Sequence, residues 1–533
     1  MTPSGKTGRT AALFAGAVLC GLLSGVLMVA ALAPYGCWPL IFVGLVPMVF
    51  AQYRLVPRVW CWIPVSLTAL VYTLGSYSRS ILGPGQGWAI EAFLIVAIVV
   101  APLAVIDRRL SERWKFKWFV LQMPVIWTGL DAIRQNFPLT GTNGYPVYAL
   151  SNEPKLIQPI SVFGISGLEL LILVINYALA LLVLHLVSGH RLAGLVPGRK
   201  LVEWVVPVVA VASVAWGVSG VMIYNSVQAS SGATVRVAVV QPGSAYAVVN
   251  NVSEPSQAQE AVFEAQLSSM TLQAARRGAQ LVVWPEEYLP FNPATAPARD
   301  KAWLRGLLRQ THVYLVTGFV DPLSKLATYW VPYSYENQAD LISPNDTILA
   351  TYTKQHQAPY DDDFFRTGTS SPSFKTRIGT IGMEICWDQS FLGPFRYSVL
   401  SGANIMAIPS WLAPAVATTQ FHDTSIFNAV QTRVPAINTD QAWTSLIVKA
   451  DGQVVAATND SSAAGATALL VGDVQLGPRN SPYLTLGNWV GELSIYGTVV
   501  IVGYGIVTMI SDRRKNRPRL AERALEGEIS ASE

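Results

Sequence analysis

The sequence predicts a membrane-embedded helical bundle joined to one α/β domain outside the cytoplasm. The chain has 533 residues, of which 51% are hydrophobic and only 13% are charged. Its mean hydropathy of +0.37 is too high for an ordinary soluble protein. Long apolar stretches occupy the N-terminal part and return near the C-terminus, whereas the segment between them alternates short apolar runs with polar ones. The chain is long enough for a membrane part and one further domain.

Eight apolar stretches are candidates for membrane-spanning helices. Most reach the roughly 20 residues that a spanning helix needs, while the second and the fifth are short. A cleaved signal peptide is the alternative for the first stretch, because Ala31-Leu32-Ala33 resembles a cleavage site. That stretch is long for a signal peptide and more spans follow at once, which favours a retained helix. The eight stretches are residues 11–32, 38–51, 59–77, 88–106, 118–130, 157–187, 202–223 and 489–510.

The distribution of basic residues predicts the orientation of these spans. If the N-terminus is cytoplasmic, the loops on the cytoplasmic side contain ten Lys and Arg residues, and the loops on the other side contain three. Basic residues are retained on the cytoplasmic side, so this assignment is favoured. A basic run follows the last span, which places the C-terminus inside as well. The formal net charge of +4 therefore indicates topology rather than nucleic-acid binding.

We expect three regions along the chain. They are a seven-helix transmembrane domain at 1–231, a catalytic domain at 232–482, and a last transmembrane helix with a basic cytoplasmic tail at 483–533. The middle region alternates strands with helices, which predicts a layered α/β domain with its chemistry at strand ends. Helical patterns cover residues 256–277, 301–309 and 420–432, and strand-like runs cover 235–241, 281–284, 313–319, 329–335, 348–352, 378–386 and 405–409.

Three reactive side chains follow strand-like segments of this domain. Glu286 comes directly after Pro285, Lys354 comes after the run at 348–352, and Cys386 ends an apolar run. A carboxylate, an ammonium and a thiol can supply the base, the oxyanion-binding cation and the nucleophile of acyl transfer. Cys386 is the only cysteine outside the membrane part, so it has no partner there for an intramolecular disulfide. The backbone amide of Trp387 is a candidate second donor to the oxyanion.

Other interpretations of these residues stay open. Glu287 can be the base instead of Glu286, although the position after Pro285 favours Glu286. A lone cysteine can also be a small buried hydrophobe. Glu384 falls on the same strand face as Cys386, and we interpret it as a partner of a basic neighbour. The histidines are scattered, so neither a metal site nor a cofactor is expected.

The order of these motifs resembles the carbon–nitrogen hydrolase (nitrilase) superfamily, whose fold implies a four-layer α-β-β-α sandwich. Placed between seven spans and one, the motifs resemble bacterial apolipoprotein N-acyltransferases. Further stretches that fit the narrower family lie at 33–39, 136–145, 163–176 and 486–489. The superfamily motifs are RVAVVQP at 236–242, VWPE at 283–286, YTK at 352–354 and IC at 385–386.

The resemblance implies a reaction, its substrates and a location. Cys386 takes an acyl chain from a phospholipid as a thioester, with Glu286 and Lys354 completing a triad. The acceptor is the α-amine of a diacylglyceryl-modified cysteine at the N-terminus of a lipoprotein, and no cofactor is implied. The protein is then a multi-pass protein of the bacterial inner membrane with a periplasmic catalytic domain.

The sequence departs from the family pattern beside the triad. The family's glutamate eight residues after its lysine falls on Asp362, and its Tyr-Glu after the cysteine is replaced by Trp387 and Asp388. Both acids are one methylene shorter, so their hydrogen-bond reach to the triad differs. Two other classes remain open: a membrane-anchored amidase or nitrilase that hydrolyses a small amide, and a catalytically inactive membrane scaffold or transporter.

Overall fold

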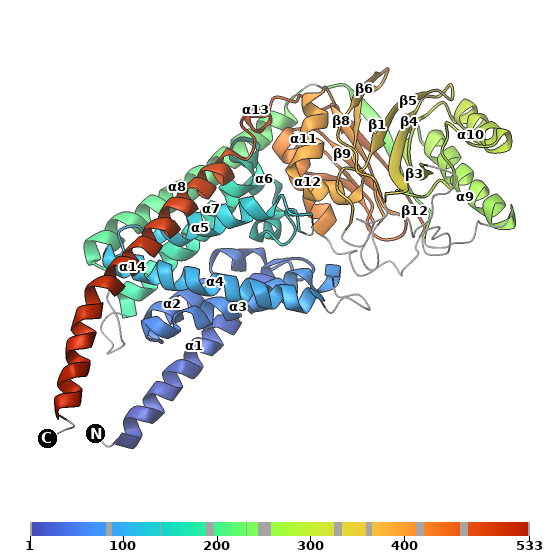
Figure 1. Cartoon of the computed structure of the whole chain (residues 1–533). Helices are drawn as coiled ribbons and strands as arrows, with labels where there is room; N and C mark the ends of the chain where they lie inside the picture. Colours follow the sequence, from blue (N-terminus) through green and yellow to red (C-terminus); the bar gives the residue numbers. More distant parts are fainter. Residues whose placement is uncertain are drawn as a thin grey trace.

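The computed structural model joins a helical bundle to an α/β domain with two sheets (Figure 1). Both termini lie at the end of the bundle that is remote from the sheets. The structure describes residues 3–81, 88–138, 140–187, 197–230, 232–243, 257–323, 333–358, 365–411, 420–458 and 467–530.

Five helices among the described residues are long and apolar enough to cross a membrane. Apolar side chains of α8 face outward, as lipid contact requires; Trp204 and Val211, for example, are exposed, whereas α7 is mostly buried within the bundle. The five segments are Thr10–Ala31 of α1 (Pro3–Ala31), Arg58–Ser76 around α3 (Trp62–Ile81), α7 (Ile160–Leu186), α8 (Arg199–Gln228) and Trp489–Asp512 of α14 (Trp489–Ser530).

The second expected span is not one continuous helix. Its residues form a short 3-10 turn, η1 (Trp38–Phe42), and the nine-residue helix α2 (Val46–Arg54). Pro47 lacks an amide hydrogen and fits the first turn of a helix, so α2 begins there. Nine residues rise about 14 Å, which is less than half of the hydrocarbon core of a bilayer. The remaining bundle helices are α4 (Trp88–Arg113), α5 (Phe119–Arg134) and the short α6 (Pro154–Ile157).

The α/β domain contains two six-stranded sheets. Three neighbouring strands run parallel in each sheet, β1-β2-β3 in the first and β7-β8-β9 in the second. The first sheet has the order β12 (Ala468–Gln475), β1 (Thr234–Gln241), β2 (Leu281–Val283), β3 (Tyr314–Pro322), β4 (Tyr335–Ile342), β5 (Ile348–Thr353). The second has the order β11 (Val454–Ala457), β10 (Leu446–Val448), β9 (Ala436–Thr439), β8 (Ile405–Pro409), β7 (Gly379–Met383), β6 (Ser373–Thr376).

Three apolar cores hold this domain together. One core is built from both sheets and includes Val237 and Ile405. A second joins the first sheet to α9 (Gln257–Arg276) and α10 (Ala298–Thr311), through side chains such as Phe263 and Leu304. The third joins the second sheet to α11 (Leu392–Leu400) and α12 (Gln420–Thr432), and it continues into the bundle. The α/β domain and the bundle therefore share one core through α12.

Most of the elements predicted for the α/β domain lie where the sequence places them, but β4 does not, and β6 was not predicted. A strand was expected at residues 329–335, but β4 begins at Tyr335 and runs to Ile342. Its sequence, YENQADLI, is mostly polar and lacks the alternation that marks a strand. These residues form a strand because they pair with β3 on one side and with β5 on the other. Residues 324–332 lie outside the described residues.

Candidate active site

Cys386 opens a sharp turn directly after strand β7. The strand ends at Met383, and residues Cys386–Ser390 form the 3-10 turn η7. The φ angle of Cys386 is 45°, a left-handed conformation that residues other than glycine adopt rarely and at a cost of about 1–3 kcal/mol. Its side chain is 4% exposed, and Sγ donates to the carbonyl oxygen of Trp411 at 3.5 Å. The turn thus presents the thiol at a strand end.

Glu286 and Lys354 form a buried ion pair beside this turn. Lys354 Nζ lies 2.7 Å from Glu286 Oε1, and both side chains are 2% exposed. Asn337 donates to the same oxygen at 2.8 Å, and the amide of Trp411 donates to Oε2 at 2.8 Å. Three donors from three separate segments therefore hold the Glu286 carboxylate in one orientation.

The surroundings of Cys386 keep its thiol protonated at rest. Burial raises the pKa of Cys386 well above its ordinary value, and the charge of Glu286 raises it further, while Lys354 acts in the opposite direction. Trp411 connects the two groups, because its carbonyl oxygen accepts from Cys386 Sγ and its amide donates to Glu286 Oε2. A protonated thiol attacks poorly. The Glu286 carboxylate is placed to accept the thiol proton during attack.

Glu287 occupies a different place from Glu286. Its carboxylate accepts from Asn337 at 2.7 Å, whereas Lys354 and the amide of Trp411 bond to Glu286. Geometry therefore favours Glu286 as the base. Asn337 and Trp411 were not anticipated from the sequence, because Asn337 lies on the polar strand β4 and Trp411 contributes only backbone groups.

Asp388 joins the lysine segment to the cysteine turn. Its carboxylate is fully buried and accepts from the hydroxyl of Tyr352 at 2.7 Å. It also accepts from the amide of His356 at 2.7 Å and from His356 Nδ1 at 2.9 Å. The His356 ring stacks on Phe391 with 3.7 Å between centroids. His356 thus pairs with Asp388, the acid that is one methylene shorter than the glutamate of the family pattern. Asp362 lies outside the described residues.

Trp387 ties the same turn to the bundle. Its side chain is 5% exposed, and Nε1 donates to the carbonyl oxygen of Pro138 at 2.9 Å. Pro138 belongs to the segment after α5. The candidate oxyanion donor is the Trp387 amide, and the side chain of the same residue is hydrogen-bonded to the membrane domain.

Glu384 is fully buried, and the expectation of a basic partner was wrong. Among the described residues, neither carboxylate oxygen has a hydrogen-bond partner. Burial, followed by the charge of Asp388, raises the pKa of Glu384 well above its ordinary value. The folded protein thus holds the Glu384 proton more tightly than the unfolded chain does.

This proton linkage predicts the stability of a Glu384→Gln variant. A raised folded-state pKa makes stability fall as the pH rises above the ordinary glutamate value of about 4.3. Glutamine stays neutral, so at pH 8 the variant should melt higher than the parent by about 2 °C or more, and the difference should shrink toward pH 5. Thermal unfolding in detergent measures this, with the exposed Glu203→Gln change as control. A lower melting temperature for Glu384→Gln at pH 8 contradicts the prediction.

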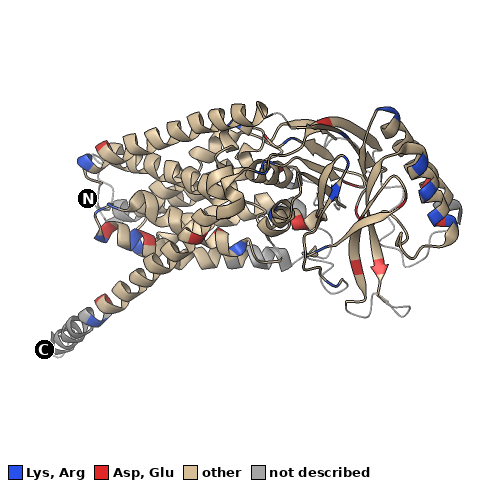
Figure 2. Ribbon diagram, turned by 90° about the horizontal axis from the view of Figure 1, so that it is seen from above, with Lys and Arg blue, Asp and Glu red and all other residues tan. Residues whose placement is uncertain are grey.

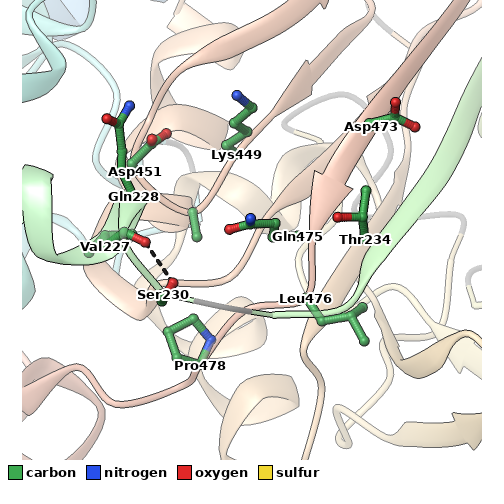
Figure 3. A pocket seen from close by; sticks show the side chains of 11 residues that line it. Val227, Gln228, Ser230, Thr234, Lys449, Asp451, Asp473, Gln475, Leu476 and Pro478 are labelled. Atoms are coloured by element: carbon green, nitrogen blue, oxygen red, sulfur yellow. Dashed lines mark hydrogen bonds between the residues drawn. The ribbon is translucent and has the colours of Figure 1, made fainter.

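A cavity of about 350 Å³ lies where α8 leads into β1 (Figure 3). Polar side chains including Lys449, Asp451 and Gln475 line it. Glu286, Lys354 and Cys386 do not line this cavity, so it is separate from the candidate active site. Among the described residues, no group of three or more His, Cys, Asp or Glu side chains is arranged to hold a metal ion.

Two protein families match separate parts of this chain. The family described as "Apolipoprotein N-acyltransferase N-terminal domain" matches residues 24–178, and "Carbon-nitrogen hydrolase" matches residues 236–478. An apolipoprotein N-acyltransferase of Geobacter metallireducens is 24% identical over 93% of this chain and 96% of its own length. A deaminated glutathione amidase of Synechocystis is 28% identical over 26% of this chain and 56% of its own length.

Among solved structures, a cysteine-to-alanine mutant of the Nesterenkonia AN1 amidase matches about half of this chain. The sequence identity is 21%, the TM-score is 0.37, and the match covers 48% of this chain and 95% of the amidase. The full-length relative and the two family matches carry the conclusion: this chain belongs to the apolipoprotein N-acyltransferase family within the carbon–nitrogen hydrolases.

Proposed function

We propose that this protein moves an acyl chain from a phospholipid, through a thioester on Cys386, to the N-terminal amine of a diacylglyceryl-cysteine lipoprotein. The observation that carries the proposal is the buried Glu286–Lys354 pair beside the Cys386 thiol, in a chain that matches an N-acyltransferase over 93% of its length. The catalytic roles of Glu286, Lys354 and Cys386 and the supporting roles of Trp387, Asp362 and Asp388 are part of this proposal.

The first half-reaction forms the thioester. Cys386 Sγ attacks the ester carbonyl of the phospholipid, and Glu286 accepts the thiol proton. Lys354 and the amide of Trp387 stabilise the negative oxygen of the tetrahedral intermediate. When the intermediate collapses, the bond to the glycerol oxygen breaks, and Glu286 returns the proton to that oxygen. The products are a lysophospholipid and an acyl-enzyme.

The second half-reaction uses the same groups in the same order. The neutral α-amine of the acceptor attacks the thioester carbonyl, and Glu286 accepts a proton from the nitrogen. Collapse of this intermediate breaks the carbon–sulfur bond and forms the amide. The proton returns from Glu286 to the sulfur of Cys386, which restores the resting enzyme.

The proposal includes a topology with eight spans, the second of them broken into η1 and α2, and a periplasmic catalytic domain. The distribution of charge supports it, because Lys and Arg gather at the end of the bundle remote from the sheets, while the middle of the bundle is almost free of charged residues (Figure 2). Basic residues mark the cytoplasmic side. We further infer domain limits of 1–231, 232–482 and 483–533, and a four-layer α-β-β-α arrangement, which the three cores of the α/β domain support.

The decisive test separates transfer from hydrolysis. In a transferase the thioester must survive water until the lipid-linked amine arrives. Purified protein incubated with radiolabelled phospholipid should therefore hold a hydroxylamine-sensitive label and release it to an added diacylglyceryl-cysteine peptide as an amide. Rapid release of free fatty acid without the peptide, or rapid turnover of a water-soluble amide, would identify an amidase. No label under any condition would favour an inactive scaffold.

A further inference from the structure

The turn that carries Cys386 is held at its far end by the membrane bundle. Ser390 is the last residue of this turn and is fully buried. Its carbonyl oxygen accepts from the amide of Thr142 at 2.8 Å and from Thr142 Oγ1 at 3.0 Å. Asn143 Nδ2 donates to the Ser390 hydroxyl at 3.1 Å. We name residues 140–145 the docking loop.

Close approach of the two backbones makes this contact sensitive to a single methyl group. Gly141 has a φ angle of 50°, and a Cβ atom placed there would lie 2.5 Å from the carbonyl oxygen of Ser390. Real Cβ atoms are essentially never that close to an oxygen, so a side chain at position 141 must displace the docking loop or the turn. Glycine also tolerates the left-handed conformation.

The docking loop is in turn fixed to three helical segments of the bundle. Arg134, at the end of α5, donates to the carbonyl oxygen of Asn143 at 2.8 Å and pairs with Asp131 at 2.9 Å. Tyr72 of α3 donates to the carbonyl oxygen of Gly144 at 2.8 Å. Tyr148 lies in the 3-10 turn η3 (Pro146–Leu150), and its hydroxyl bonds to Thr142 Oγ1 at 2.7 Å. The loop is therefore a rigid extension of the membrane domain.

We infer that the docking loop positions the nucleophile: the bundle sets the place of Cys386 relative to Glu286 and Lys354 by holding Ser390. Glu286 and Lys354 follow strands of the first sheet, whereas Cys386 follows a strand of the second. Asp388 already joins the cysteine turn to the lysine segment, and the docking loop adds a second hold from the bundle, four residues from the thiol. Thr142, Asn143 and Gly141 are thus positioning residues. This inference rests on the proposed role of Cys386 as nucleophile.

The test compares Gly141→Ala with Gly278→Ala in the full-length protein. Gly278 also has a positive φ angle, but its added Cβ would meet only ordinary contacts at 3.5 Å. Misplacing a reacting group by about 1 Å can cost a factor of about 100. We expect Gly141→Ala to slow acyl-enzyme formation tenfold or more at saturating phospholipid, with KM changed less than about twofold. Gly278→Ala should match the parent.

If the Gly141→Ala protein does not fold, a second pair of variants tests the same inference. Thr142→Val keeps the shape of the side chain but removes the hydroxyl donor, and should lower the rate about three- to tenfold. Thr142→Ser keeps the hydroxyl and should stay close to the parent. The rate of Cys386 alkylation by iodoacetamide, followed on the Cys386 peptide by mass spectrometry, should change in parallel, and it needs no acyl donor.

The outcomes separate this inference from the proposed function. Parental rates and parental alkylation in both Gly141→Ala and Thr142→Val, with Cys386→Ala inactive, overturn the positioning role and leave the nucleophile in place. A loss confined to KM also overturns it, because it assigns the docking loop to substrate binding. Turnover that survives in Cys386→Ala refutes the nucleophile itself.

Discussion

Cys386→Ala is expected to abolish the acyl-enzyme and to lower turnover by a factor on the order of 10⁴ or more, the largest effect that any single change should have. The thiol is the atom that forms the bond to the acyl chain, and neighbouring groups cannot replace it. A missing hydroxylamine-sensitive label after incubation with radiolabelled phospholipid, together with an unchanged melting temperature, is the expected result. Alanine keeps the Cβ atom, so it relieves the strain of the left-handed conformation at this position only slightly, and the melting temperature should not rise.

Cys386→Ser should leave little activity for a different reason. The pKa of the thiol is already raised by burial and by Glu286, and a hydroxyl is much harder to deprotonate than a thiol. The control is Cys37→Ala, which removes an exposed free cysteine and should retain full turnover. Unchanged turnover in Cys386→Ala would remove the nucleophile assignment.

Lys354→Ala should lower turnover by a factor of about 100 or more, because a fixed ammonium beside the developing oxyanion is lost. Lys354→Arg should not restore the rate, since a planar guanidinium places its charge differently from a compact ammonium. Near-normal turnover in the arginine variant would indicate general attraction of charge. Steady-state rates with phospholipid and the acceptor peptide measure both variants.

Stability must be separated from catalysis in this experiment. Removing Lys354 alone leaves Glu286 as a buried charge that has lost its ion-pair partner, and such a change typically costs about 3–5 kcal/mol. The double variant Lys354→Met with Glu286→Gln removes both charges and should melt close to the parent while its turnover stays low. Recovery of turnover in the double variant would show that the single change acted only through folding.

The candidate triad could be predicted from the sequence, because each member stands at the end of an apolar run in an order typical of one chemistry. Trp387 and Asp388 were also singled out, but the groups that hold Glu286 in place were not. Asn337 lies on a strand without an apolar pattern, and Trp411 acts through its backbone amide and carbonyl oxygen. Glu384 was expected to have a basic partner, and the structure buries it without one among the described residues.

The sequence by itself determined what depends on local composition: which stretches are apolar enough to prefer lipid, where most strands and helices of the α/β domain begin, and which thiol stands alone. Apolar runs and charges act on their own segment, so these features need no knowledge of distant residues. Even so, the second expected span is broken into η1 and α2, where a proline interrupts the apolar run.

Only the tertiary structure decided how distant segments meet. It brought Lys354 to within 2.7 Å of Glu286, gave Asp388 its partners Tyr352 and His356, and placed Thr142 of the bundle on the carbonyl oxygen of Ser390. The physical reason is that hydrogen bonds and ion pairs form between atoms that approach within about 3 Å, and that approach is set by the packing of sheets and helices rather than by neighbours in the chain.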